Sequence, residues 1–325
     1  MLNHQYTENN HFKWGYNGEW FNTRKDAYDS FQVDFGKVSR KVNSFRDECY
    51  DVARKIYEYG LQIDKTPDLM FSGGSESEMM VRSFVEQGLP VNVHIMVFEN
   101  NLNLHDISHA IVYCERNVVP YKLHTVNIEE VLKLKGMLYA AHSQCISPRM
   151  LPHMWLLNEL KDGFPIMGMG EVYIAHEHIK AYYEIKDGTV KRNEYNEYHH
   201  APWHLYEREK INSWYRFSQH LDITSVPGFF QYTPEIILSF LEEPLTKELS
   251  ECKHKGKLSN TSTKLLIYDK HFPGILQRTK RDGFERLGHV DKEMRKHLLE
   301  KYGNYSQEYL WEYNDLVNHL RGENG

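Results

Sequence analysis

Apolar residues change their spacing along the chain from a helical to a strand-like pattern and back several times. Between residues 37 and 59 they recur three or four positions apart, which predicts an amphipathic helix. From residue 67 to residue 167, short apolar runs alternate with helical patterns, and this alternation predicts an α/β fold whose parallel strands are joined by right-handed crossovers. The runs predict strands at 68–71, 91–98, 121–126 and 164–167, and the intervening segments predict helices at 76–87, 104–117, 128–138 and 154–160.

The segments on either side of this run have different patterns. Asn17-Gly18, among aromatic residues, predicts a hairpin near the start of the chain, and Asp187-Gly188 predicts a two-stranded excursion at 182–195 within the Tyr/His-rich stretch 173–215. Thr233 followed by Pro234 predicts a capped helix start. We expect two amphipathic helices between 292 and 320. The predicted divisions are an N-terminal extension (1–65), an α/β domain (66–180), a hairpin excursion or lid (181–215) and a helical region that completes the site (216–325).

Composition narrows the class of protein. The 325 residues are 41 % hydrophobic and 13 % aromatic, which excludes a disordered chain, and the net charge of −6 argues against wholesale coating of nucleic acid. No uncharged apolar run approaches the ~18 residues of a membrane span, and the start lacks an apolar signal core. We therefore expect no membrane partner and a cytoplasmic location, in the host if the chain is viral. The four cysteines lack CxxC spacing and predict buried, reduced thiols.

One loop carries the clearest chemical signal. Residues 71–77, Phe-Ser-Gly-Gly-Ser-Glu-Ser, follow the first predicted strand of the α/β run and open a helix. Two glycines let the backbone turn tightly and approach a ligand. The amides of the first helical turn have no partners within the helix, and together with the helix dipole they form an anion site. The pattern therefore predicts a phosphate-binding loop, although no Walker loop or dinucleotide fingerprint occurs in the chain.

The loop resembles the SGGxDS signature of the PP-loop ATP pyrophosphatases, which include asparagine synthetases, GMP synthetases, NAD synthetases and tRNA lysidine synthases. The resemblance rests on Ser72, Gly73, Gly74 and Ser77, while Glu76 replaces the usual aspartate. It spans roughly residues 66–290 and implies an adenine nucleotide α-hydrolase-like, HUP-type fold. The nearest look-alikes are stand-alone members, many encoded by bacteriophages. Because residue 2 is leucine and the loop begins early, we expect no glutaminase domain of the asparagine synthetases in this chain.

Two further segments fit this resemblance. Gly168-Met-Gly170-Glu171 follows the last predicted strand and resembles a glycine turn whose acid holds magnesium pyrophosphate in asparagine-synthetase-like proteins. Residues 251–281 contain eight Lys or Arg and two acids, which suits polyphosphate neutralisation. Lys264 and the stretch from Arg278 through Lys280 resemble the C-terminal part of those proteins, where a lysine stabilises the adenylation transition state. A solvated basic face is the simpler interpretation of such a cluster.

The resemblance implies an ATP-dependent ligase or synthetase. ATP would place adenine near the second strand, a substrate carboxylate or carbonyl oxygen would be adenylated with release of pyrophosphate, and a nitrogen nucleophile would complete an amidation. The implied cofactors are ATP and Mg²⁺, and the substrate is a small molecule. The residues implied are, for ATP, Phe71, Ser72, Gly73, Gly74, Ser75, Glu76, Ser77, Val97, Phe98, Gly168 and Gly170; for Mg²⁺, Glu76 and Glu171; and for catalysis, Lys280, Lys264 and Arg278.

Other functions remain open at this point. An enzyme of the same fold could amidate or thiolate a tRNA or DNA base, using the 251–281 segment to bind the nucleic acid; thiolation would need a reactive cysteine, for which Cys145 is the candidate. An inactive nucleotide-binding or interaction protein is the third class, suggested by Glu76. His105 and His109 have the spacing of a zinc helix, but no third ligand is marked. The sequence leaves assembly as a homo-oligomer open.

Overall fold

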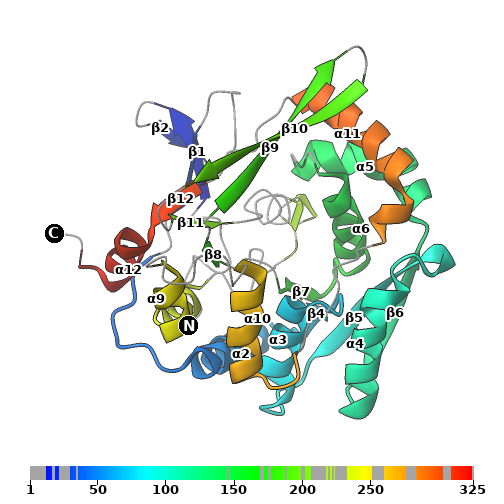
Figure 1. Cartoon of the computed structure of the whole chain (residues 1–325). Helices are drawn as coiled ribbons and strands as arrows, with labels where there is room; N and C mark the ends of the chain where they lie inside the picture. The colour runs from blue at the N-terminus through cyan, green and yellow to red at the C-terminus, as the bar shows by residue number, and fades with distance from the viewer. Residues whose placement is uncertain are drawn as a thin grey trace.

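A computed structural model describes most of the chain (Figure 1). For the strands between residues 12 and 33, for those between 172 and 205, for 309–312, and for residues 248–250, 260–263 and 302, only the backbone is described. The described residues are 12–16, 19–21, 30–33, 36–143, 145, 147–168, 172–174, 177–186, 189–198, 202–205, 217–218, 220–221, 223, 233–250, 260–275, 283–302 and 309–323.

A four-stranded, all-parallel sheet forms the centre of the fold, in the order β6-β5-β4-β7. The chain is thus an α/β protein, and the four predicted strands are confirmed to within one residue at each end. Strands β4 and β7 are completely buried, as expected of parallel strands covered by helices on both faces, whereas the edge strand β6 exposes Lys122, Leu123 and Thr125. The strands are β4 (Pro67–Met70), β5 (Asn92–Phe98), β6 (Tyr121–Val126) and β7 (Phe164–Met167).

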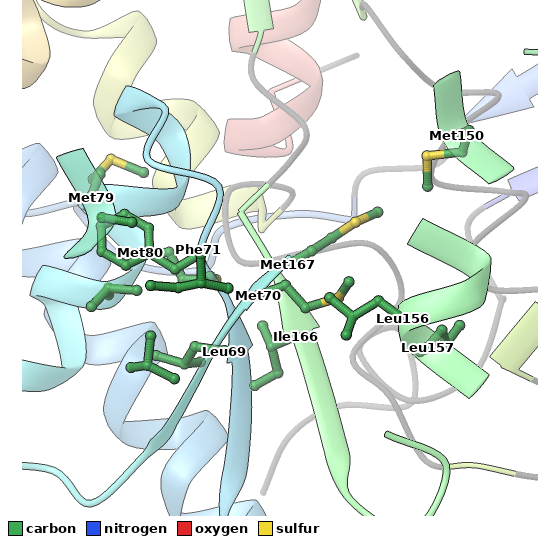
Figure 2. Close-up of a cluster of buried hydrophobic side chains, with 14 of the residues drawn as sticks. Leu69, Met70, Phe71, Met79, Met80, Met150, Leu156, Leu157, Ile166 and Met167 are labelled. Carbon is green, nitrogen blue, oxygen red and sulfur yellow. The ribbon is translucent and has the colours of Figure 1, made fainter. Parts of the chain in front are cut away.

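Helices cover both faces of this sheet. In Figure 2, Met79 and Met80 of α3 lie on one side of the strands, and Leu156 and Leu157 of α6 lie on the other. All four side chains are buried. The predicted helices are confirmed, with α5 extending five residues further than its apolar pattern indicated. The helices and short 3-10 turns of this region are α3 (Ser75–Val85), η1 (Glu99–Asn101), α4 (Leu104–Arg116), α5 (Ile128–Ser143), η2 (Pro148–Met150) and α6 (Leu151–Glu159).

The helix predicted from residue 37 begins later than expected. It is α2 (Phe45–Gln62), and the Ser44 side chain caps it by accepting a hydrogen bond from the amide of Asp47 at 3.2 Å. Val38 is nevertheless buried, because its amide donates to the Leu320 carbonyl oxygen at 2.7 Å and holds an extended segment against the end of the chain. The helical spacing upstream of Ser44 was therefore coincidental.

The C-terminal region is mainly helical but contains one strand that the sequence did not predict. Thr233 caps α8 through its side chain, and Pro234 occupies the first turn, as expected. The two helices predicted between 292 and 320 are confirmed as α11 and α12, and the unpredicted strand β12 precedes the second one. The elements are α8 (Pro234–Leu241), α9 (Pro244–Ser250), α10 (Asn260–His271), η3 (Phe284–Arg286), α11 (Gly288–Tyr302), β12 (Tyr309–Glu312) and α12 (Tyr313–Arg321).

Three smaller antiparallel sheets complete the described structure. Both predicted hairpins are confirmed, since Tyr16 pairs with Glu19 and Lys186 pairs with Thr189 across two-residue connections. Strand β12 pairs with β11, which also pairs with β8. The strands are β1 (Phe12–Tyr16), β2 (Glu19–Phe21), β3 (Ser30–Val33), β8 (Val172–Ile174), β9 (Glu177–Lys186), β10 (Thr189–Tyr198) and β11 (Pro202–Leu205).

Two sequence expectations about the whole chain can be checked on the described residues. Cys49, Cys114 and Cys145 are buried and form no disulfide, and burial raises the pKa of the Cys114 thiol to about 12. Cys252 lies outside the described residues. Among the described helices, none combines the length and the apolar character that a membrane crossing requires.

Candidate functional site

The fold brings the two glycine turns that the sequence singled out to one place. Strands β4 and β7 are parallel neighbours, and Met70 pairs with Met167, so the segments that follow both strands leave the same edge of the sheet. Gly168 then lies directly against the start of α3. A Cβ atom on Gly168 would come within 2.8 Å of the Cα atom of Ser77 and 2.9 Å of the Glu76 carbonyl oxygen. Only glycine permits this approach.

The strand order places this edge where ligands bind in α/β proteins. The chain moves outward from β4 through β5 to β6, and then returns to the opposite side of β4 to form β7. Such a reversal of direction opens a crevice at the carboxyl ends of the central strands. The 72–77 loop follows β4, which is the strand at the reversal. Sequence patterns predicted the strands but did not specify this order.

Gly73 and Gly74 have different roles in the loop. Gly73 has a positive φ of 85°, and an added Cβ atom would collide with the carbonyl oxygen of Asp106 in α4. Gly74 is the N-cap of α3 with φ −73° and ψ 160°, a conformation that any residue can adopt. An added Cβ atom there would make only ordinary contacts, 3.4 Å from side-chain oxygens of Ser72 and Glu76. The fold therefore requires glycine at 73, whereas at 74 it leaves room for a side chain.

Hydroxyl groups brace the loop from within. The Ser77 hydroxyl donates to the Gly74 carbonyl oxygen at 3.0 Å, which leaves the Ser72 hydroxyl to donate to Ser77 Oγ, also at 3.0 Å. The Gly74 amide in turn donates to Ser72 Oγ at 3.3 Å. Two of the three serines expected to contact a ligand are thus already used to hold the shape of the turn.

The start of α3 supplies the polarity of an anion site. The first hydrogen bond within the helix runs from the Glu78 amide to the Gly74 carbonyl oxygen, at 2.9 Å. Helix geometry therefore gives the amides of Ser75, Glu76 and Ser77 no acceptor within α3, and the positive end of the helix dipole lies at the same point. This arrangement can hold a phosphate group.

A lysine from a distant helix reaches the loop. Lys264 of α10 forms an ion pair with Glu76 through Nζ and Oε1, although the two residues are 188 positions apart. The Lys264 side chain is 3 % exposed and that of Glu76 is 14 % exposed. Lys264 is therefore not part of a solvated basic face. The structure brings this predicted catalytic residue to the predicted phosphate loop.

Aromatic packing fixes α10 in this position. Tyr268 stacks on Phe45 of α2, with ring centroids 5.6 Å apart and planes within 6° of parallel. Arg82 of α3 donates to the Phe272 and Pro273 carbonyl oxygens, at 3.1 and 3.0 Å. In Figure 1, α10 lies beside α2 and α3. These contacts hold the helix that carries Lys264 against the helix that carries the loop.

Residues 283 and 284, far downstream in the chain, pack against the end of β5. Phe98 packs edge to face on Phe284, with centroids 6.0 Å apart, and Gly283 comes so close that a Cβ atom would lie 3.0 Å from the Phe98 ring. Arg149 lies over the other ring of this pair, 5.9 Å from the Phe284 centroid. The Phe98 side chain is thus buried, while Val97 is only partly buried. Phe71 also points into the core, against Tyr113 of α4.

Several predicted residues cannot be placed. Gly170, Glu171, Arg278 and Lys280 lie outside the described residues, as do most of the basic residues of the 251–281 segment. Lys270, which is described, pairs with Glu243. His105 and His109 both lie on α4, and the described part of the chain contains no group of three or more residues that could hold a metal ion.

Sequence reasoning missed one buried polar group and one pairing. Asp68, His94 and His124 form a hydrogen-bonded line inside the sheet. The signal for it was present, because each is a polar residue inside an apolar strand. The pairing of Glu76 with Lys264 gave no such signal.

Comparison with protein-family profiles finds no match for this chain, and a search of curated proteins finds no similar sequence.

Proposed function

We propose that this protein binds ATP through the 72–77 loop and adenylates a substrate oxygen with release of pyrophosphate. The observation that carries the proposal is the meeting of three separate segments at one edge of the sheet: the loop after β4, Gly168 after β7, and Lys264 of α10. The sequence pattern of each segment independently indicates a phosphate-related role.

The loop would bind the β- and γ-phosphates of ATP. The amides of Ser75, Glu76 and Ser77 supply donors, and the brace between Ser72 and Ser77 keeps the turn from collapsing when no ligand is bound. Gly74 lacks a side chain at the point where the phosphates would approach. Preorganised donors of this kind stabilise charge without having to rearrange during the reaction.

Glu76 and Lys264 would neutralise the negative charge of the nucleotide, Glu76 by holding Mg²⁺ and Lys264 by contacting phosphate oxygens directly. The carboxylate of Glu76 offers the hard oxygen ligand that Mg²⁺ prefers, and its Oε2 atom lies on the Gly74 side of the loop, so this residue would hold the metal near the proposed phosphate site. Glu171 is the second ligand that we propose. When bound, Mg²⁺ would spread the negative charge of the pyrophosphate. Lys264 would exchange part of its contact with Glu76 for the phosphate oxygens.

The chemical step follows from this arrangement. A carboxylate or carbonyl oxygen of the substrate attacks the α-phosphorus, the bond between that phosphorus and the bridging oxygen breaks, and pyrophosphate leaves with the electron pair. Lys264, with Lys280 and Arg278 as further candidates, offsets the charge that develops on the leaving group. A nitrogen nucleophile then displaces AMP.

The α/β architecture and its strand order support our assignment of a HUP-type fold to the central region.

The direct test is a product assay. Purified protein is incubated with ATP, Mg²⁺ and a panel of small carboxylic acids and amides, and AMP and pyrophosphate are measured. We expect both to form in equal amounts. Lys264→Met should abolish turnover, while Lys270→Met, on the same helix but with a 59 % exposed side chain, should not. Formation of ADP and orthophosphate would overturn the reaction class.

A second candidate function is nucleotide binding without turnover. The observation that favours it is the ion pair itself, because Lys264 lies on the carboxylate that would hold the metal. If Lys264 does not leave Glu76, ATP could bind to the loop amides but magnesium would not be held correctly. Tight ATP binding with no AMP formation across the substrate panel would support this candidate. The described lysines of the 251–281 segment are paired with acids, so they add nothing in favour of nucleic-acid binding.

A further inference from the structure

A line of polar side chains crosses three strands inside the sheet. His94 Nε2 lies 3.0 Å from Asp68 Oδ1, and His94 Nδ1 lies 2.8 Å from His124 Nε2. The three residues are between 5 % and 8 % exposed. They belong to β4, β5 and β6, so the line connects the strand that leads into the loop with the edge of the sheet.

The hydrogen bonds define where the protons are. The Asp68 carboxylate accepts three of them, from the Asn92 side chain at 2.9 Å, from the Phe164 amide at 2.9 Å and from His94. His94 therefore carries a proton on Nε2. In its neutral form its Nδ1 atom accepts, so His124 must donate from Nε2. With these protons, each contact along the line joins one hydrogen-bond donor to one acceptor.

The hydrogen bond between His94 and His124 cannot form when both rings are fully protonated. If both rings were charged, the N–H groups of His94 and His124 would face each other across 2.8 Å, and the bond between them would be lost. Burial, together with the neighbouring His94 and Lys122, lowers the pKa of His124 to about 4, although Asp68 acts in the opposite direction. Within the described part of the chain, these three are the charged groups that act on His124.

The line is joined to the candidate nucleotide loop through the backbone. The Phe71 amide donates to the His94 carbonyl oxygen at 2.8 Å, and Phe71 is the residue immediately before Ser72. His94 thus holds the proton line with its ring and the base of the loop with its carbonyl group. A shift of the His94 backbone would therefore move Phe71 and, through it, the start of the loop.

We propose that the Asp68–His94–His124 line is an acid-sensitive device, which keeps β4, β5 and β6 in register while at least one of the two rings is neutral and releases them, together with the loop, when His94 and His124 are both charged. The stability part of this inference stands on the cluster alone. Only its effect on nucleotide binding rests on the proposed function.

The direction of the pH effect follows from linkage. An unfolded chain binds a proton on histidine near pH 6.5, whereas folded His124 does so only near pH 4. The contribution of His124 to stability is therefore constant above about pH 6.5 and falls as the pH drops toward 4. The full separation of the two pKa values corresponds to a change of about 300-fold in the unfolding equilibrium constant. Asp68, whose pKa is lowered by its hydrogen bonds despite the opposing effect of burial, loses its contribution only at lower pH.

The test measures chemical denaturation of the whole protein between pH 7.5 and pH 4.5, without nucleotide. Wild-type protein should lose stability steeply below pH 6.5. His124→Gln, which keeps a donor for His94, should flatten this dependence, and His289→Gln should leave it as in wild type, because His289 has a side chain that is 70 % exposed. An unchanged slope in His124→Gln would overturn the proposal.

A second measurement needs no variant. The ring nitrogens of His124 can be followed by NMR in labelled wild-type protein, and we expect the ring to remain neutral down to about pH 5. Titration of His124 at pH 6 or above would overturn the inference, even if His124→Gln failed to fold. Binding of ATP, measured over the same pH range, tests the link to the loop. Absence of ATP binding at every pH would count against the proposed function and leave the stability result intact.

Discussion

Lys264 and Glu76 form an ion pair that joins α10 to the first turn of α3. Their side chains are 3 % and 14 % exposed, so each charge is largely removed from water and is compensated in part by the other. The pair lies at the loop that we propose binds phosphate. Its energetic role and its role in binding can be separated by experiment.

Removing the lysine alone should be costly. In Lys264→Met the Glu76 carboxylate stays in place without this cation, and breaking a buried pair in this way costs ~3–5 kcal/mol of the free energy of unfolding. The double variant Glu76→Gln/Lys264→Met should recover most of that loss, because no uncompensated charge remains. Urea denaturation measures both. Equal losses in the single and double variants would show that the pair contributes nothing specific.

The two loop glycines should respond differently to alanine. Gly73→Ala forces a side chain into a positive φ and against the Asp106 carbonyl oxygen, so the protein should lose stability by ~1–3 kcal/mol or more. Gly74→Ala should leave the melting temperature nearly unchanged, because its conformation is ordinary and its surroundings have room. Calorimetric titration should nevertheless show weaker ATP binding for Gly74→Ala. Unchanged affinity in that variant would contradict phosphate approach at Gly74.

Gly168 should be needed for the two turns to meet. A methyl group in Gly168→Ala would come within 2.8 Å of backbone atoms of α3, so β7 and the start of that helix would have to move apart. We expect a fall in melting temperature and a loss of ATP binding together. Gly288→Ala is the control, because a Cβ atom there meets nothing within 4 Å. Gly168→Ala with wild-type stability would mean that the contact between β7 and α3 is looser than described.

Two serines of α3 offer a matched comparison. Ser77 Oγ donates to the Gly74 carbonyl oxygen at 3.0 Å, and Ser83 Oγ donates to the Met79 carbonyl oxygen at 2.7 Å. Each alanine substitution should cost ~1 kcal/mol of the free energy of unfolding, as for a typical buried hydrogen bond. Only Ser77→Ala should also weaken ATP binding, because it loosens the loop. Similar binding in both variants would assign the Ser77 hydroxyl a purely structural role.

The sequence predicted where the helices and strands begin and end better than it predicted which of them pack together. Strand β6 has the predicted bounds of 121–126, and helix α8 starts at Pro234 as predicted, because an apolar run, or a cap followed by proline, is a local signal. The pairing of β4 with β7 was not predictable in this way, since it depends on where a distant segment returns. Strand β12 was missed for the same reason: its partner, β11, is far away in the chain.

The candidate site shows the same division. The 72–77 loop could be identified from its glycines and serines, because they act through the local backbone. That Lys264 would be buried against Glu76, rather than exposed among other basic residues, depends on the packing of Tyr268 on Phe45. Aromatic residues at these positions indicate a core in general, but they do not specify which helices meet.

The contact of Gly168 with the start of α3 also constrains the order in which the protein can mature. A chain emerging from the ribosome would expose the 72–77 turn long before β7 is synthesised, and longer still before α10 arrives. During that interval the turn would lack both its neighbour and its cation. If the loop binds ATP as we propose, chains that end before α10 should therefore be unable to capture the nucleotide.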